Sequence, residues 1–569
     1  MGTIFALLKE NKGKAAVFAA GLALFSAALL PKAALEDAFS RYTFYCLLAL
    51  YLALAGAIIA FAAKRREQLP EFFARNKRGF LFSLALAAVI FAAAKPSFRI
   101  LSDETNLLSV SRTMLSERRV DNITMGKWYY FNLQPLARER DKRPYAYPFA
   151  VYAAHALTGY RPANAFAVNF VLLVLLFCGV FALFRGLYGE VAAYCAVLLA
   201  AAQPLLILNA ASGGMDFMYA ALIFFSFLAL REYLRDGGPE TFGLLLALLL
   251  LLANTRYEGP VFLAAAALVL PLAGRVKAAA LATWQFAVLP LAVLPVFIQR
   301  VCFSTNFEQA AGVVPFSAAN LLKNSVSFVL LQFNNGSLLF PYASLVNLAG
   351  LAAAGALFLR LARRGGGEGQ DRLLAGVSAA GLALYWLVTC LYYFGDPAHQ
   401  ASARLFLPAA LTLSLLAAGL LARATRGRPV PALLAASALF LFYAPIAAEN
   451  RFYNSLFLGR EYRHQVSFLE ELGDKHILLI SDRPGQFVVL DRGAVNFDYA
   501  RASYPSLADE QRRHLYSRVI VFQEILFATG KPTPSTELGP EYKLRPLLER
   551  QNTGDSFLRF SEVIFPPAP

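Results

Sequence analysis

Long apolar segments separated by short polar ones dominate the hydrophobic pattern of this chain. A helix needs ~20 apolar residues to cross the hydrocarbon core of a bilayer. The segments that meet this criterion are residues 14–34, 42–63, 79–97, 163–185, 190–211, 216–234, 242–255, 260–274, 278–300, 343–362, 373–394, 406–422 and 429–448. The pattern therefore predicts a mainly α-helical, polytopic transmembrane bundle of about 13 spans.

The pattern changes abruptly after residue 448. Short apolar runs at 476–482, 486–490 and 518–522 resemble strands, and they alternate with polar helical stretches such as 506–517. This alternation predicts a small α/β domain over residues 449–569.

The expected domain organisation has three parts. Residues 1–78 form two N-terminal transmembrane helices, and residues 79–448 form the main transmembrane domain. That domain includes a long loop, 98–162, which is expected to carry interfacial helices. The C-terminal α/β domain, 449–569, is the third part.

Composition agrees with a membrane protein. The chain is 58% hydrophobic and 16% charged, with a mean hydropathy of +0.51, which leaves too little polar surface for a soluble protein of this size. The net charge of +16 would suggest nucleic acid in a soluble protein. Here Lys and Arg are concentrated in short loops, at 64–78, 360–372 and 423–428, so we expect no nucleic-acid partner. The five cysteines show no spacing typical of disulfides or zinc.

The basic loops also predict the orientation. They fall on one side of the expected spans, which the positive-inside rule makes cytoplasmic. The segments 98–162, 301–342 and 449–569 then lie outside. The 98–162 loop is itself basic, but loops longer than ~60 residues follow the rule poorly.

The first outer loop opens with an acidic pair, Asp103 and Glu104, directly after Ser102. One interpretation is structural, with Ser102 as N-cap and the acids stabilised by the dipole of an interfacial helix. The other is functional, with the carboxylates as a general base and a metal or acceptor ligand. Spacing alone favours the structural interpretation.

The same loop ends in a segment of cations, prolines and aromatic residues that contains Lys142, Arg143 and Tyr145. Such a segment suits an aromatic belt at the membrane interface. It also suits a site for an anionic lipid headgroup or a phosphate.

Three further outer turns carry polar residues next to apolar helices. Asp216 starts a span and could simply cap it. Arg256 and Glu258 could form an interfacial ion pair, although charges at such places are often functional. Arg404 leads into a span, where the helix dipole favours an anion, and this misfit suggests an anionic partner such as a phosphate. His399 is a candidate base or metal ligand, although a lone histidine is more often neither.

These motifs resemble the GT-C class of integral-membrane glycosyltransferases, and within it the protein O-mannosyltransferase and lipid A aminoarabinose transferase group. In that group an Asp-Glu pair opens the first large outer loop, as Asp103 and Glu104 do here. A basic, Pro-containing segment, an acid at a helix start and an Arg before an aromatic and Leu-Pro follow in that group. Residues 143–148, Asp216 and residues 404–408 resemble them, with Leu405 inserted before the aromatic. The resemblance covers roughly 79–448. Two spans precede it, and Pro144-Tyr145 replaces the usual Pro-Pro pair.

The resemblance implies transfer of a sugar from a polyprenyl-phosphate donor to a lipid, glycan or protein acceptor at the outer membrane face, with inversion by direct displacement. Asp103 would be the general base, and Glu104 would orient the acceptor or bind a metal. Arg256 and Arg404 would hold the donor phosphate, with Lys142 or Arg143. The expected location is the inner (plasma) membrane of a bacterium.

Two candidates for a divalent-metal ligand emerge, Glu104 and His399. A transporter or flippase of a lipid-linked sugar is the alternative function. It would require ionisable residues deep within spans and inverted repeats, and the sequence shows little of either. A non-catalytic scaffold would leave the outer-face acids and arginines unexplained.

Overall fold

The computed structural model describes residues 12–25, 32–129, 132–274, 282–303, 314–333, 341–363, 369–425, 428–474 and 476–566. Parts of the expected basic loops and of the 301–342 segment lie outside these ranges. The chain divides into two compact units. The helical unit comprises residues 1–97, 142–150 and 166–452, and the sheet unit comprises residues 98–141, 151–165 and 453–569.

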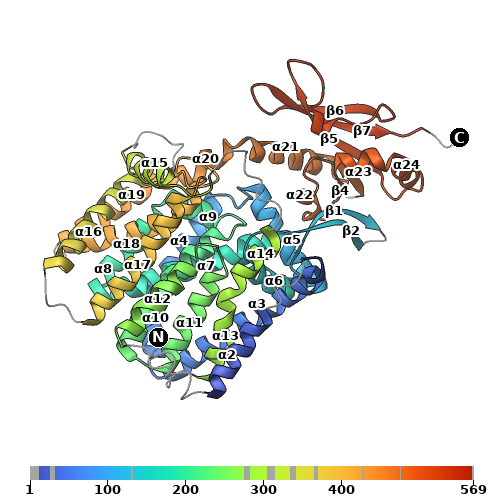
Figure 1. Ribbon diagram of the computed structural model, residues 1–569. Coiled ribbons are helices and arrows are strands. Elements are labelled where there is room, and N and C mark those ends of the chain that lie inside the picture. Colours follow the sequence, from blue (N-terminus) through green and yellow to red (C-terminus); the bar gives the residue numbers. More distant parts are fainter. Residues whose placement is uncertain are drawn as a thin grey trace. The chain divides into compact units, whose positions relative to one another are not determined.

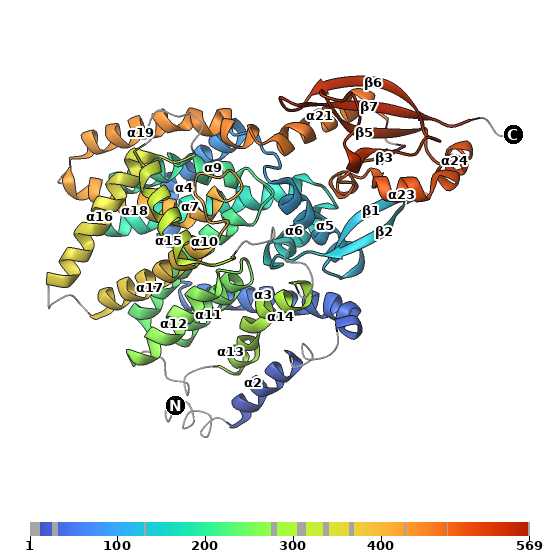
Figure 2. The ribbon, with the colours of Figure 1, turned by 45° about the horizontal axis from the view of Figure 1, so that its top comes forward.

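The helical unit contains both long apolar helices and shorter ones (Figures 1 and 2). Among the described residues, 7 helices are long and apolar enough to cross a membrane, or 8 if one bent pair is a single span. The shorter apolar helices include Pro239–Ala253 and Ala318–Leu331. The chain is thus a multi-spanning membrane protein, while the count of about 13 spans stays a prediction.

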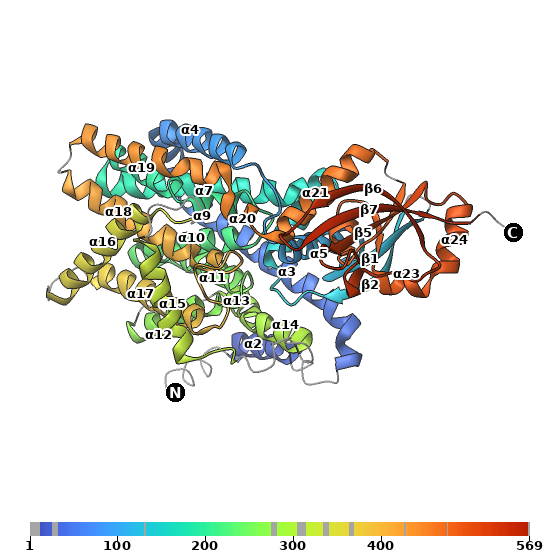
Figure 3. The same cartoon turned by 90° about the horizontal axis from the view of Figure 1, so that it is seen from above.

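Most helices of this unit fall in the expected apolar segments, whereas α15 (Ala318–Leu331) lies in the segment 301–342, where no span was expected. Their bounds are α2 Lys12–Phe25, α3 Lys32–Lys64, α4 Leu69–Ala93, α7 Ala163–Tyr188, α8 Glu190–Ala201, α9 Pro204–Ala210, α10 Asp216–Asp236, α11 Pro239–Ala253, α12 Pro260–Leu272, α13 Thr283–Val288, η3 Leu289–Val293, α14 Leu294–Phe303, α15 Ala318–Leu331, α16 Ser344–Arg363, α17 Gly369–Leu391, η4 Ala403–Phe406, α18 Leu407–Ala424 and α19 Pro429–Glu449. Close pairs include α16 with α18, α10 with α11, and α12 with α17 (Figure 3). Helix α8 packs closely on α19.

The expected single span 190–211 is broken. Helices α8 and α9 meet at an angle of 74°, with Gln203 in an extended conformation between them. Pro204 explains the break, because a proline removes one backbone donor and disfavours the helical conformation of the residue before it. The span expected at 278–300 is similarly divided into α13, η3 and α14.

A network of uncharged polar side chains is buried at this break. Gln203 Nε2 donates to Asn347 Oδ1 at 2.7 Å and to Ser414 Oγ at 2.8 Å. Asn347 Nδ2 in turn donates to Gln332 Oε1 at 2.7 Å. All four side chains are fully buried. Gln203 Oε1 also accepts a hydrogen bond from the N–H of Ala343 at 3.3 Å, so the network ties the break to the backbone just before α16.

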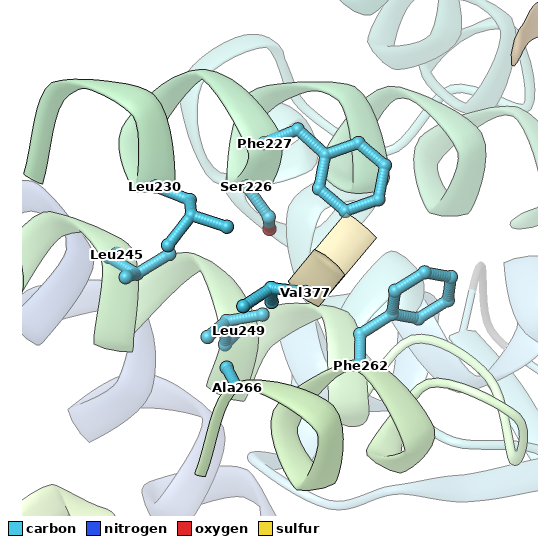
Figure 4. Close-up of a pocket in the computed structure, with 8 residues that line it drawn as sticks. All are labelled: Ser226, Phe227, Leu230, Leu245, Leu249, Phe262, Ala266 and Val377. Carbon is cyan, nitrogen blue, oxygen red and sulfur yellow. The ribbon is translucent and has the colours of Figure 1, made fainter. Parts of the chain in front are cut away.

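A small cavity lies among α10, α11, α12 and α17 (Figure 4). Ser226 is the one residue that lines the cavity with a polar side chain, and its hydroxyl points toward the cavity. An ordered water requires two to four polar partners, so this cavity offers no polar binding site. Its lining residues are Ser226, Phe227, Leu230, Leu245, Leu249, Phe262, Ala266 and Val377.

The sheet unit contains a seven-stranded sheet in the order β2-β1-β4-β3-β5-β7-β6, seen at the upper right of Figure 1. The central strands β4, β3 and β5 are parallel, and antiparallel hairpins flank them. The hairpin β1–β2 belongs to the loop 98–162, so this loop and the C-terminal segment 449–569 form one sheet. The expected division kept these two segments in separate domains.

The elements of this unit are α5 Leu101–Glu117, β1 Asp121–Tyr129, β2 Asn132–Arg140, α6 Ala146–Thr158, α20 Arg451–Asn454, α21 Phe457–Leu472, β3 Ile477–Ile480, α22 Gly485–Val488, β4 Gly493–Val495, α23 Phe497–Ala502, α24 Tyr504–Arg512, β5 Arg518–Leu526, η5 Pro534–Thr536, β6 Lys543–Gln551 and β7 Ser556–Ile564. Helices α6 and α20 both begin in the helical unit. The strands expected near 476–482 and 518–522 are confirmed, as is the helix in 506–517. The strand expected at 486–490 is wrong, because this run forms α22 and the turn after it. An apolar run buried on all sides has the same pattern in a helix and in a strand.

Both faces of the sheet are covered. Ile477 and Leu479 of β3 point into one apolar core, with Phe468 and Phe560. Leu478 and Ile480 point into the other. A strand buried on both faces reads as a continuous apolar run rather than an alternating one, which explains why the sequence revealed β3 readily.

Candidate functional site

Four charged side chains meet at the N-terminus of α10 in the helical unit. Arg256 Nη1 donates to Oδ1 of Asp216, and Arg404 Nη1 donates to Oδ2 of the same carboxylate at 3.2 Å. Arg256 also holds Glu258, with Nε 3.1 Å from Oε2 and Nη2 3.3 Å from Oε1. One carboxylate therefore accepts a hydrogen bond from each of two guanidinium groups.

The cluster is withdrawn from solvent. The side chains of Asp216, Arg256 and Arg404 are 4%, 9% and 10% exposed. Buried charges are stable only when they are paired, so each member depends on the others. The ring of Tyr219, one turn along α10, lies 5.8 Å from the Arg256 guanidinium. This cluster contains two cations and two anions.

Arg256 and Glu258 are carried by the turn 254–259 between α11 and α12. The side chain of Asn254 fixes the start of this turn, since its Nδ2 donates to the carbonyls of Leu250 at 2.9 Å and Leu291 at 3.1 Å. At the end of the turn, a Cβ on Gly259 would collide with the carbonyl of Leu252. The turn thus requires a glycine there in order to pack closely against α11.

Asp216 is the first residue of α10, and Met215 is the N-cap. The sequence allowed Asp216 a simple capping role, but its carboxylate instead pairs with Arg256 and Arg404. The preceding turn is held by Asn169 of α7, whose Nδ2 donates to the carbonyls of Ser212 at 2.8 Å and Gly214 at 2.9 Å. Asn169 is fully buried. It therefore fixes the backbone that delivers Asp216 to the cluster.

Arg404 lies in the short helix η4, where its Nε donates to the carbonyl of Ala401 at 2.9 Å. The hydroxyl of Tyr385 donates to the carbonyl of Leu405 and anchors the same segment. The dipole argument predicted an anionic partner for Arg404, and Asp216 is one such partner within the chain.

The basic segment 142–150 adjoins the turn 254–259, because the Ala146 N–H donates to the carbonyl of Asn254 at 3.1 Å. Lys142 is exposed and Arg143 is half-buried. Tyr145 is fully buried, with its hydroxyl 3.8 Å from Cys302 Sγ. Tyr145 thus packs inside the helical unit, and the two cations precede it in the segment.

Asp103 and Glu104 belong to the sheet unit, in the first turn of α5. The two oxygens of Glu104 accept hydrogen bonds from the backbone N–H groups of Arg99 and Ile100, each at 3.1 Å. The interpretation of Ser102 as N-cap is wrong, because the helix starts at Leu101 and Glu104 reaches back to satisfy the N-terminal donors instead. Asp103 is 8% exposed.

His399 is an exposed residue of the helical unit. Its Nδ1 accepts a hydrogen bond from the N–H of Ala401 at 3.3 Å. Across the described ranges, no three or more His, Cys, Asp or Glu side chains are grouped so as to hold a metal ion. The divalent metal on Glu104 and His399 stays a prediction.

A buried group in the sheet unit has the composition of a hydrolase triad but not its chemistry. His155 lies between Ser111 Oγ, 3.1 Å from Nε2, and Asn164 Nδ2, 2.8 Å from Nδ1. Since the amide donates to Nδ1, the proton sits on Nε2 and is donated to the serine. Ser111 Oγ donates in turn to the carbonyl of Leu108 at 2.7 Å. His155 therefore cannot accept the serine proton, and burial lowers its pKa to about 4.

Asn169 and Gln203 support the helical unit from buried positions and were not predicted from the sequence. Both are single uncharged polar residues within apolar segments. Polar residues in transmembrane segments are rare and tend to be retained for a reason, and this was the available signal.

Together these features define an integral-membrane protein whose helical unit buries a paired arginine cluster and whose second unit is a mixed sheet. Among solved structures, the chain is similar to ArnT from Cupriavidus metallidurans bound to undecaprenyl phosphate, at 11% identity over 84% of this chain and 97% of that one, with a TM-score of 0.50. It is also similar to the apo state of ArnT from that organism, at 13% identity over the same shares, with a TM-score of 0.41. No protein-family model matches the chain, and no curated protein matches it.

The first of these structures confirms, at the level of the fold, the resemblance to the lipid A aminoarabinose transferase group of the GT-C class. This likeness concerns the fold, and it assigns no role to any single residue of the chain.

Proposed function

We propose that the protein is a membrane glycosyltransferase that moves a sugar from a polyprenyl-phosphate donor to a lipid, glycan or protein acceptor. Two observations support the proposal. The fold is that of ArnT, whose structure contains undecaprenyl phosphate. In addition, the helical unit buries two arginines at the end of a membrane-spanning helix.

The arrangement of Arg256 and Arg404 on one carboxylate carries the proposal. Two guanidinium groups repel each other, and Asp216 offsets this repulsion by accepting a hydrogen bond from each of them. The planar donors of arginine suit phosphate oxygens. A leaving polyprenyl phosphate would be stabilised by donors placed in advance in a dry site. The charges of the two arginines in the cluster are balanced by those of Asp216 and Glu258, so the cluster has no net positive charge. In the proposal, that charge comes from Lys142 and Arg143, which lie on the segment bonded to the Arg256 turn.

In the proposed reaction, Asp103 takes the proton of the acceptor hydroxyl. The acceptor oxygen then attacks the anomeric carbon while the bond between that carbon and the phosphate oxygen breaks. Polyprenyl phosphate leaves with the bonding electrons, and the anomeric configuration is inverted. Glu104 serves Asp103 by fixing the helix start from which it projects.

The proposed face of the membrane is the extracytoplasmic one. Helix α10 has 21 residues, which gives a length of about 30 Å, enough to cross the hydrocarbon core. Asp216 begins this helix. At its other end, Asp236 pairs with Lys64 at 2.7 Å, and Lys64 belongs to an expected cytoplasmic loop. If that loop is inside, Asp216 is outside.

The phosphate site is tested by measuring the affinity of the purified protein for undecaprenyl phosphate. Replacing Arg256→Lys or Arg404→Lys keeps the charge but loses the planar fork, and we expect the Kd to rise at least about tenfold, or 1.4 kcal/mol. The control is Arg423→Lys, in an expected cytoplasmic loop, which should leave the Kd unchanged. Unchanged affinity in both site variants would refute the phosphate site.

The transfer step is tested in liposomes that contain an undecaprenyl-phosphate-linked sugar. Asp103→Asn should abolish transfer while it preserves affinity for undecaprenyl phosphate, because only the base is lost. Glu117→Gln, at the other end of α5, is the control. Movement of the donor between leaflets without any transfer would support the transporter instead, and a chelator in the same assay tests the predicted metal.

A further inference from the structure

Helix α3 precedes the part of the chain that resembles the glycosyltransferase group, yet it touches the basic segment of the candidate site. The hydroxyl of Tyr51 donates to the carbonyl of Ala146 at 2.8 Å. The N–H of the same alanine donates to the carbonyl of Asn254 at 3.1 Å. Ala146 thus links α3 to the turn that carries Arg256 and Glu258.

Aromatic packing reinforces this link. The ring of Tyr51 stacks on Phe149, with centroids 4.8 Å apart and an interplanar angle of 27°. The ring of Phe44, two turns earlier on α3, has its centroid 5.7 Å from that of Phe149. Aromatic pairs at these distances contribute beyond the area they bury. The segment 142–150 is therefore held by α3 through both a hydrogen bond and a ring stack.

A second pair of contacts fixes α3 along its length. Helix α3 packs on α11, and Lys64 at its end pairs with Glu240 of α11 at 3.2 Å and with Asp236 at 2.7 Å. The distance from Tyr51 to Lys64 along α3 and the distance from Glu240 to Asn254 along α11 are both about 20 Å. The two helices thus run antiparallel in matched register, with contacts at both ends.

We propose that Tyr51 is a positioning residue, through which α3 holds the basic segment 142–150 against the Arg256 turn. The proposal rests on the proposed function, since it assumes that Lys142, Arg143 and Arg256 meet the donor phosphate. It gives the additional N-terminal helix a role: to place cations beside a cluster whose own charges are balanced.

The physical reason is geometric. Lys142 and Arg143 lie in a segment without transmembrane anchoring of its own, four residues or fewer from Ala146. A shift of about 1 Å in such a segment would weaken charge-assisted hydrogen bonds to a phosphate, even though all groups remain present. The contacts of Tyr51 with the segment are those with Ala146 and Phe149, and the proposed effect on the donor site runs through them.

The test is Tyr51→Phe, which removes the hydroxyl but keeps the ring that stacks on Phe149. We expect the KM for the undecaprenyl-phosphate-linked donor, and the Kd for undecaprenyl phosphate, to rise about 3- to 10-fold. This is the fold-change that corresponds to the loss of one hydrogen bond. The kcat should stay within about twofold. A merely structural residue would lower thermal stability without this division between KM and kcat. Tyr45→Phe is the matched control, because Tyr45 is on the same helix but 54% exposed.

If Tyr51→Phe does not accumulate as folded protein, Phe149→Leu weakens the same contact from the other side and should raise the KM likewise. A KM for Tyr51→Phe equal to that of Tyr45→Phe, while Arg256→Lys still loses affinity, would overturn the positioning role alone. If Arg256→Lys also keeps full affinity, the phosphate site itself is wrong.

Discussion

Arg404 and Asp216 are separated by 188 positions in the sequence, yet Nη1 of the arginine lies 3.2 Å from Oδ2 of the aspartate. Because Arg256 takes the other oxygen, Asp216 is the element of the cluster on which both cations depend. Several consequences can be measured.

Replacing Asp216→Asn would leave two buried arginines without their shared charge. Removing one partner from a buried ion pair typically costs about 3–5 kcal/mol, so we expect a clear fall in the thermal unfolding midpoint in detergent and loss of affinity for undecaprenyl phosphate. Asp371→Asn, at an exposed position on α17, should change neither. A stable Asp216→Asn protein with full affinity would show that the cluster does not organise the site.

Asn169→Ala would remove both donors that hold the carbonyls of Ser212 and Gly214. We expect a loss of stability of about 1–3 kcal/mol, because two buried acceptors lose their partner. The affinity for undecaprenyl phosphate should also fall, since the turn delivers Asp216. In an Asp216→Asn background, the substitution should add little to the loss of affinity. Additive losses would instead assign Asn169 a purely structural role.

The stability of the sheet unit should fall as the pH drops below about 6.5, the usual pKa of histidine. Burial lowers the pKa of His155 to about 4, so between these values the unfolded chain binds a proton that the folded chain does not. The free energy of unfolding should decrease by up to roughly 3 kcal/mol by pH 4. Unfolding midpoints from pH 7 to 4 measure this. His155→Gln should flatten the profile, whereas His476→Gln, at an exposed position, should not.

Glu461 should destabilise the sheet unit at alkaline pH. Burial, together with the charge of Asp482, raises its pKa to about 7. Between the usual pKa of glutamate and about 7, the folded chain keeps a proton that the unfolded chain has already released. The free energy of unfolding therefore decreases as the pH rises through this window, and the loss is complete above it. Glu461→Gln should therefore increase the free energy of unfolding at pH 8, by roughly 2 kcal/mol. Glu471→Gln, exposed on the same helix, is the control, and equal effects of the two variants would contradict the prediction.

The alternation of apolar and polar segments determined the class of fold. Spans such as α7, α10 and α19 were evident because a helix in a bilayer must be apolar over a fixed length, a requirement that does not depend on its neighbours. The strands β3 and β5 were evident for a similar reason, since strands buried on both faces are continuously apolar. Local chemistry also suggested which charges were unusual, among them Arg404 at the start of a span.

The tertiary structure alone decided how these pieces combine. The sequence did not reveal that the loop 98–162 contributes β1 and β2 to the C-terminal sheet, because pairing between distant strands depends on neighbours that no local pattern encodes. It did not reveal that Arg256 and Arg404 share Asp216, nor that Tyr51 bonds Ala146. Hydropathy records how apolar a position is, whereas such contacts depend on the direction of single side chains and on the packing that brings remote helices together.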